Sequence, residues 1–133
     1  GGRINTDGSG ASQFFHRIAV DQETGHVAIS WYDARGEPLD LTKVRFFATH
    51  TSSLVPLTFV PEFPVLADEE PSDGTPLPGA SQAQAQGTLG DYTGIDFGGG
   101  VFYPAWANNS GTYGNPEPGK ADLFTNPVTV VAP

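Results

Sequence analysis

The sequence contains neither cysteine nor methionine among its 133 residues. The lack of cysteine excludes disulfides, thiolate metal ligands and cysteine nucleophiles. Apolar runs are also short, and none approaches the roughly 20 residues of a membrane-spanning helix. Because the chain begins Gly1-Gly2-Arg3 rather than with methionine, we expect a processed product or a fragment.

Positive charge is scarce as well. Six Lys and Arg residues stand against 15 Asp and Glu residues, which gives a formal net charge of −9. Proteins bind nucleic acid mainly by neutralising phosphates with Lys and Arg, and anionic membranes attract the same residues. We therefore predict no nucleic-acid partner and no membrane insertion, and we interpret the acidic surface as solvating.

What the sequence does contain favours strands. It has 17 Gly and 12 Pro, which are typical of short strands joined by tight turns. Valine, threonine and phenylalanine supply strand propensity, and no segment carries an apolar stripe at helical spacing. The predicted fold class is all-β.

The segment 25–35 occurs nearly twice, at an offset of 75 positions. Trp31 aligns with Trp106, and these are the two tryptophans of the chain. The same gapless alignment pairs Asp21 with Asp96 and Asp33 with Asn108. Each copy predicts a hairpin, closed by Glu23-Thr24-Gly25 in the first and Gly98-Gly99-Gly100 in the second. A repeat at fixed offset indicates an array, blade or solenoid.

We divide the chain into an N-terminal loop (1–13), a first blade-like unit (14–66), a long Pro/Gln-rich loop (67–89) and a second blade-like unit (90–133). The strand expected from Phe14 to Asp21 is apolar enough for burial on both faces. Prolines 61 and 64 place the strand expected from Leu57 to Val65 at the edge of its sheet. Further strands are expected over 27–32, 44–51, the repeat ending at Trp106 and about 122–131.

Residues 12–21 and 25–35 resemble the sialidase-like β-propellers with BNR (Asp-box) repeats. In that family a strand ending in Val-Asp leads through a Gly turn into a Trp-x-Asp-x-Arg segment. The later segment 90–95, with Trp106 and Asp122-Leu123-Phe124, looks like the closing blade. The resemblance implies two antiparallel, blade-like sheets from the C-terminal part of a propeller, and a secreted or extracellular location.

The family's Asp box joins the third and fourth strands of a blade. Ser52, Thr58 and Phe59 stand at the spacing of this motif, but Leu54 and Pro56 replace its Asp and central Gly. The box is therefore degenerate. Because the missing Asp would cap a turn through backbone hydrogen bonds, its loss weakens a turn and not a catalyst.

The resemblance would also imply an arginine triad, an acid/base carboxyl and a Tyr–Glu nucleophile. No motif assigns the four arginines to a triad, and Arg35, two residues after Asp33, suits a local ion pair better. Glu62 stands in a Pro-rich stretch, where a solvated role is the default. The histidines lack metal-ligand spacing. We predict no catalytic residues, no metal and no cofactor.

Asp91 and Tyr92, with Arg35, are the candidate ligand-binding residues. An acid and a phenol after a long loop suit a carbohydrate site through hydrogen bonds and stacking. The alternative is that Asp91 caps the turn and Tyr92 packs. Asn108-Asn109-Ser110 is a sequon, which makes Asn108 a candidate for N-glycosylation in an exported chain.

Two blades leave apolar sheet faces uncovered, so we predict partners: the remaining blades of a parent propeller, or copies of this chain. We expect the apolar face of each unit to need cover on the side that points away from the other unit. These faces carry Val27, Ile29 and Trp31 in the first unit and Phe102 and Trp106 in the second. The predicted function is a noncatalytic propeller segment for extracellular binding or scaffolding. The alternatives are a self-assembling extracellular fibre or sheath subunit and a fragment of an active exo-glycosidase (sialidase).

Overall fold

The computed structural model describes residues 2–35, 43–67, 72–73, 89, 92–109 and 121–130. Over these ranges the chain forms two antiparallel sheets, with no helix and no closed barrel. The all-β prediction is confirmed. None of the described segments is a helix long and apolar enough to cross a membrane.

The first sheet is a meander of β1 (Gln13–Val20), β2 (Val27–Asp33) and β3 (Lys43–Leu54). Three short segments pair in turn along the far edge of β3: β4 (Leu57–Phe59), β5 (Phe63–Pro64) and β6 (Ser72–Asp73). They act as one broken edge strand, and the edge position expected from the prolines is confirmed. Strand β6 falls inside the stretch that the sequence predicted as loop.

The second sheet is built on the hairpin of β7 (Gly94–Gly98) and β8 (Val101–Asn108). The other edge of β8 pairs with β9 (Asp122–Thr125) and then with β10 (Val128–Thr129). Both sheets therefore place the tryptophan-bearing strand, β2 or β8, between two neighbours. Each also ends in an edge made of short pieces.

The two hairpins match less closely than the sequence alignment. Phe102, which aligns with Val27, pairs with Phe97, whereas Val27 pairs with Val20. Strand β7 is thus displaced by two residues relative to β1. The displacement follows from the tight turn at Gly99 and Gly100, whose positive φ angles of 59° and 77° suit glycine.

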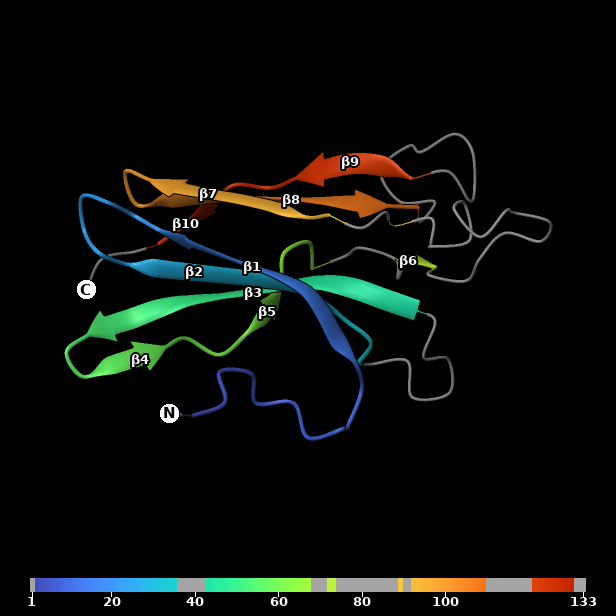
Figure 1. Cartoon of the computed structure of the whole chain (residues 1–133), viewed down its shortest axis with the longest axis horizontal. Helices are drawn as coiled ribbons and strands as arrows, with labels where there is room; N and C mark the ends of the chain where they lie inside the picture. Colours follow the sequence, from blue (N-terminus) through green and yellow to red (C-terminus); the bar gives the residue numbers. More distant parts are fainter. Residues whose placement is uncertain are drawn as a thin grey trace.

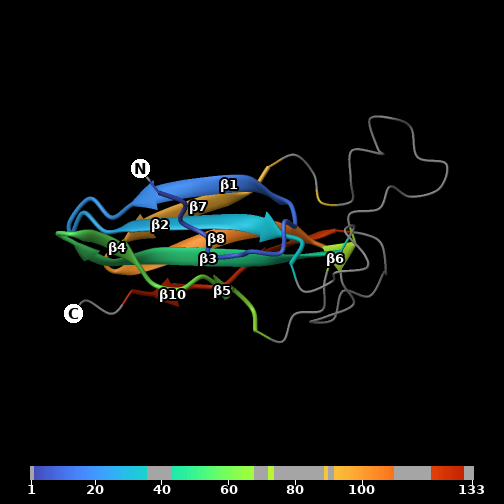
Figure 2. The same ribbon diagram turned by 90° about the horizontal axis from the view of Figure 1, so that it is seen from below.

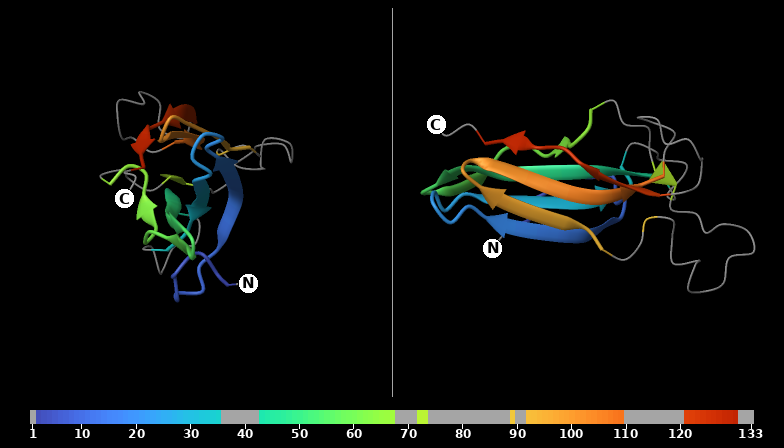
Figure 3. Two further views of the ribbon diagram at one scale, coloured as in Figure 1. Left: turned by 90° about the vertical axis from the view of Figure 1, so that its left-hand side faces the viewer. Right: turned by 90° about the horizontal axis from the view of Figure 1, so that it is seen from above.

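The two sheets lie one above the other, and equivalent strands run in the same direction (Figure 1). Strands β2 and β8 point to the right in that view, and β1 and β7 point to the left. Hydrogen bonds fix this alignment. Tyr32 Oη donates to the Ala107 carbonyl at 2.6 Å, and Thr93 Oγ1 donates to the Phe15 carbonyl at 2.8 Å. The second sheet therefore lies above the first, as the end-on view shows (Figure 3), with equivalent strands running in the same direction. We call this arrangement a same-sense stack.

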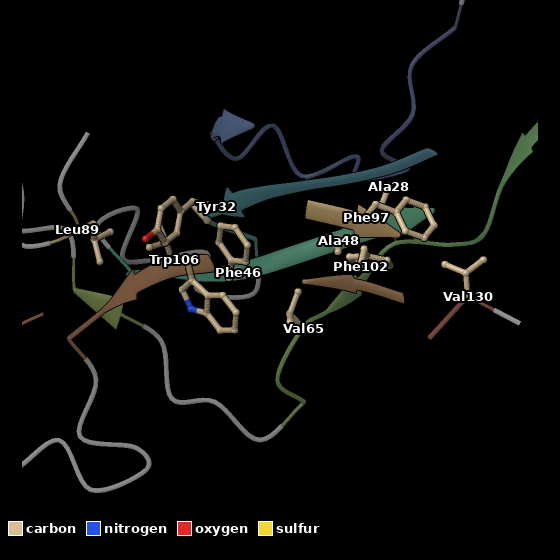
Figure 4. Close-up of a cluster of buried hydrophobic side chains, with 12 residues drawn as sticks. Ala28, Tyr32, Phe46, Ala48, Val65, Leu89, Phe97, Phe102, Trp106 and Val130 are labelled. Carbon is tan, nitrogen blue, oxygen red and sulfur yellow. The ribbon is translucent and has the colours of Figure 1, made fainter. Parts of the chain in front are cut away.

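The core fills the space between the sheets (Figure 4). The indole of Trp106 stacks on Phe46 of the first sheet, with ring centroids 4.8 Å apart and planes 3° from parallel. Phe102 is fully buried in the same layer. Trp106 and Phe102 are thus covered within the chain. The expectation that they need an outside partner is wrong, because they face the first sheet and not away from it.

Trp31 lies on the opposite face of the first sheet from its neighbour Tyr32. Tyr32 belongs to the core between the sheets, and side chains alternate along a strand. Trp31 instead pairs across the strands with Phe47, at a centroid distance of 6.5 Å. Since the sheets stack in the same sense, Trp31 and Trp106 face the same way in successive sheets.

Strand β1 is half exposed. Ile18 and Val20 are 64% and 42% exposed, so the prediction that this strand is buried on both faces is wrong. The reason is that β1 is an edge strand with one face turned away from the second sheet. A bulge between Phe14 and Arg17, where Phe15 has a φ of +53°, lets both phenylalanines pack against the core.

Candidate functional site

The side of the first sheet that faces away from the second sheet, here called the outer face, is the candidate site. It carries Trp31 together with two cross-strand pairs, Ile18↔Ile29 and Val20↔Val27. Trp31 is 5% exposed, but Ile18 is largely open to solvent. The outer face is therefore apolar and only partly covered.

The cover comes from the N-terminal segment, residues 2–12, which crosses the outer face in Figure 2. Two grooves of about 540 and 670 Å³ lie beside it, and both are lined by Gly2, Ile4, Ile18 and Ile29. The first groove extends to Trp31, and the second to Phe59.

The N-terminal segment is tied to the sheet through Glu62. The backbone N–H and the hydroxyl of Thr6 donate to Glu62 Oε1 at 2.8 and 2.9 Å. Next along the chain, the Asp7 carboxylate accepts hydrogen bonds from the N–H and hydroxyl of Ser9. The Ser9 N–H lowers the pKa of Asp7. These contacts hold residues 6–9 in place and leave Gly2 to Ile4 over the grooves.

Arg35 joins two buried carboxylates at one end of the outer face. Its guanidinium lies 2.7 Å from Asp33 Oδ2 and 2.6 Å from Glu62 Oε1, and it stacks over the Phe47 ring at 4.7 Å. Trp31 Nε1 also donates to Asp33 Oδ2, at 2.8 Å. The predicted local ion pair between Asp33 and Arg35 is present, and the cluster fixes the orientation of Trp31.

Glu62 is not the solvated surface residue that the sequence suggested, because its side chain is only 3% exposed. Burial by itself would raise its pKa. Hydrogen bonds from Arg35 and Thr6 outweigh that effect and lower the pKa of Glu62 to about 2. Burial likewise acts to lower the pKa of Arg35, but its bonds to Asp33 and Glu62 raise it overall.

The predicted carbohydrate site is not assembled by the described residues. Asp91 lies outside them. Tyr92 is 79% exposed, and Arg35 is occupied by its two carboxylates. Within the described ranges no hydrogen bond, ion pair or ring contact joins Tyr92 to Arg35, so sugar binding by these three residues stays a prediction.

The aligned aspartates of the repeat have different roles. Asp21 is fully buried and accepts hydrogen bonds from Glu23 N–H at 3.0 Å and Gly100 N–H at 2.9 Å. Both hydrogen bonds lower the pKa of Asp21, and the one from Gly100 has the larger effect. Its counterpart Asp96 is exposed and accepts only from the neighbouring Phe97 N–H among the hydrogen bonds that the structure describes. Asp21 thus connects the two hairpins.

Asn108 ends β8 and is fully buried. A glycan on this amide has no room in the folded chain, which argues against the predicted N-glycosylation; Ser110 of the sequon lies outside the described residues. In the degenerate Asp box, the hydroxyls of Ser52 and Thr58 are hydrogen bonded at 2.8 Å across the β3–β4 hairpin. Phe59 pairs there with Thr51. This contact closes the hairpin that an Asp would have capped.

The molecule also has a second open surface. The side of the second sheet that faces away from the first, here called the far face, carries Tyr103 and Leu123, which are 50% and 80% exposed. By strand alternation Ala105 and Ala107 lie between them. The outer face and the far face are the two ends of the two-sheet stack.

Comparison with known proteins adds no relative. No family model, curated protein or solved structure matches the chain. Among the described side chains no group of three or more His, Asp or Glu residues could hold a metal ion. The chemistry of the candidate site is therefore that of its own surface, an apolar sheet face bordered by a buried ion-pair cluster. Such a face suits another sheet or an apolar ligand.

Proposed function

We propose that this chain is a noncatalytic, two-blade segment of a sialidase-like β-propeller that serves binding or scaffolding outside the cell. The observation that carries the proposal is the same-sense stack, in which Trp106 lies between the sheets while Trp31 lies on the outer face. Blades of a propeller repeat in this way, each stacking on the next. A sandwich of two sheets related by a two-fold axis would bury both tryptophans at its centre.

The open ends explain why such a segment would need partners. At about 25 cal/mol per Å², leaving 400 Å² of apolar surface in water forfeits roughly 10 kcal/mol. That loss is comparable to the whole stability of a domain, roughly 5–15 kcal/mol. We propose that further sheets, from a parent propeller or from copies of the chain, cover the outer face and the far face.

The arginines support a noncatalytic role. Arg35 is bound by Asp33 and Glu62, and Arg17 donates to the carbonyls of Thr93 and His16. Arg3 donates to the carbonyls of Asn5 and Asp7. Each of these three guanidinium groups thus already has protein partners, and the three lie at separate places, whereas a triad needs three of the chain's four arginines to converge on one substrate carboxylate.

Hydrolysis of a fluorogenic sialoside tests this role. We expect the purified chain to give no turnover above buffer, with an active sialidase as the positive control. Turnover that persists through purification, disappears in Asp91→Ala and remains in Asp122→Ala would contradict the proposal. It would favour the fragment of an active exo-glycosidase instead.

A further inference from the structure

We propose that the outer face binds a second copy of this chain, head to tail, so that the far face of one copy stacks on the outer face of the next. This inference rests on the proposed function and names which sheet covers the open end. Its template is the contact between the two sheets inside the chain.

Inside the chain, Phe46 of the first sheet covers Trp106 of the second. Phe46 is the cross-strand partner of Tyr32. The repeat aligns Tyr32 with Ala107, whose cross-strand partner on β9 is Leu123. Leu123 therefore holds in the second sheet the place that Phe46 holds in the first, yet its side chain is 80% exposed.

A second copy stacked by the same step would satisfy this position. Leu123 of one copy would pack on Trp31 of the next, as Phe46 packs on Trp106. Tyr103, which aligns with Ala28 at the centre of the first sheet, would face the same groove. The exposed Ile18 and Val20 would supply the edge of the contact. The incoming sheet takes the place of Gly2 to Ile4, and Ile4 is already 41% exposed.

Every copy carries both faces, and the two are different surfaces. Such a contact is heterologous, so it grows into a filament unless its rotation closes a ring. The net charge of −9 on each copy opposes association. Because salt screens this repulsion over a Debye length, the association should strengthen as ionic strength rises.

Three aspartate substitutions at exposed residues test the contact. Leu123→Asp damages the far face and Ile18→Asp damages the outer face. Val55→Asp, at a residue that is 91% exposed in the turn between β3 and β4, is the matched control. By light scattering we expect wild type and Val55→Asp to gain mass with concentration. Each face variant should weaken self-association roughly tenfold or more, because a charge is placed in an apolar contact.

Mixing the two face variants tests the head-to-tail arrangement. Leu123→Asp keeps an intact outer face and Ile18→Asp an intact far face, so an equimolar mixture should form a one-to-one dimer and nothing larger. A mixture that stays monomeric at concentrations where wild type associates would overturn the proposal. Association of wild type that neither substitution weakens would overturn it as well.

The dye ANS, which fluoresces on exposed apolar surface, separates this inference from the proposed function. Wild type that stays monomeric at all concentrations but binds ANS overturns the second copy as partner and leaves an open propeller segment. A monomer that binds no ANS contradicts both. Circular dichroism of each variant checks that it retains the sheet signal of wild type.

Discussion

Glu62 shows how one side chain connects the separate parts of the outer face. It accepts hydrogen bonds from Thr6 of the N-terminal segment and from Arg35 at the end of β2. Arg35 in turn holds Asp33, which accepts from the Trp31 indole. The carboxylate is charged in the folded chain because these donors outweigh its burial. Removing that charge should loosen the N-terminal segment and Trp31 together.

We expect Glu62→Gln to lower the free energy of unfolding by about 1–3 kcal/mol at neutral pH, since charge-assisted hydrogen bonds are lost from a buried group. Urea unfolding over a pH series measures it. The folded pKa of about 2 lies below the ordinary 4.5, so the stabilisation is complete above pH 4.5. It is lost as the pH falls toward 2, and the difference between wild type and variant should shrink over that range.

Glu23→Gln is the control for this series, because the Glu23 side chain is exposed. It should change the unfolding free energy little at any pH. A gap between wild type and Glu62→Gln that stays constant down to pH 2 would contradict the assignment of the charge to Glu62.

Only part of this cluster could be predicted from the sequence. Asp33 and Arg35 stand two positions apart after a strand, which is enough to predict their ion pair. Glu62 is 27 positions from Arg35, and it reaches the cluster because the broken edge strand returns along β3. Local sequence says nothing of that return, so it predicts a solvated Glu62.

Among the elements, the two hairpins are the units that the repeat encodes. Asp21, just after β1, accepts a hydrogen bond from the N–H of Gly100 in the other hairpin. This bond fixes how the two hairpins are aligned in the stack. The turn Gly99-Gly100 can present that N–H because its glycines adopt positive φ.

Asp21→Ala should lower the urea midpoint of unfolding, because the N–H groups of Glu23 and Gly100 lose the buried carboxylate that accepts their hydrogen bonds. The exposed Asp96→Ala, at the aligned position, should lower it less. Since hydrogen bonds lower the pKa of Asp21, its stabilising effect is present above the ordinary value of 3.8 and is lost as the pH falls below it. Equal midpoints for the two variants would show that Asp21 does not connect the hairpins.

The sequence was informative about elements and less so about their faces. Period-2 alternation located β2 and β8, and two prolines located the edge of the first sheet. A two-residue strand such as β6 leaves no periodic signal, and the displacement of β7 depends on turn geometry that a gapless alignment hides. Alternation also cannot tell which face meets the other sheet, so it predicts neither the cover over Trp106 nor the exposure of one face of β1.

At the scale of the whole molecule, two sheets stack in the same sense and leave two unlike faces open. The interior contact between Phe46 and Trp106 is made once, and the positions for making it again are occupied by Trp31 at one end and Leu123 at the other. A stack of this kind has no internal reason to stop at two sheets. These two open faces support our proposal that further sheets complete the stack.

The mass of the wild-type chain by light scattering, measured across a dilution series with ANS present, tests this view most directly. It predicts ANS binding at the lowest concentration and a mass that rises above the 14.0 kDa of one chain as concentration increases. A monodisperse monomer of 14.0 kDa that unfolds cooperatively and does not raise ANS fluorescence would show that the two sheets are complete on their own, and would contradict the account.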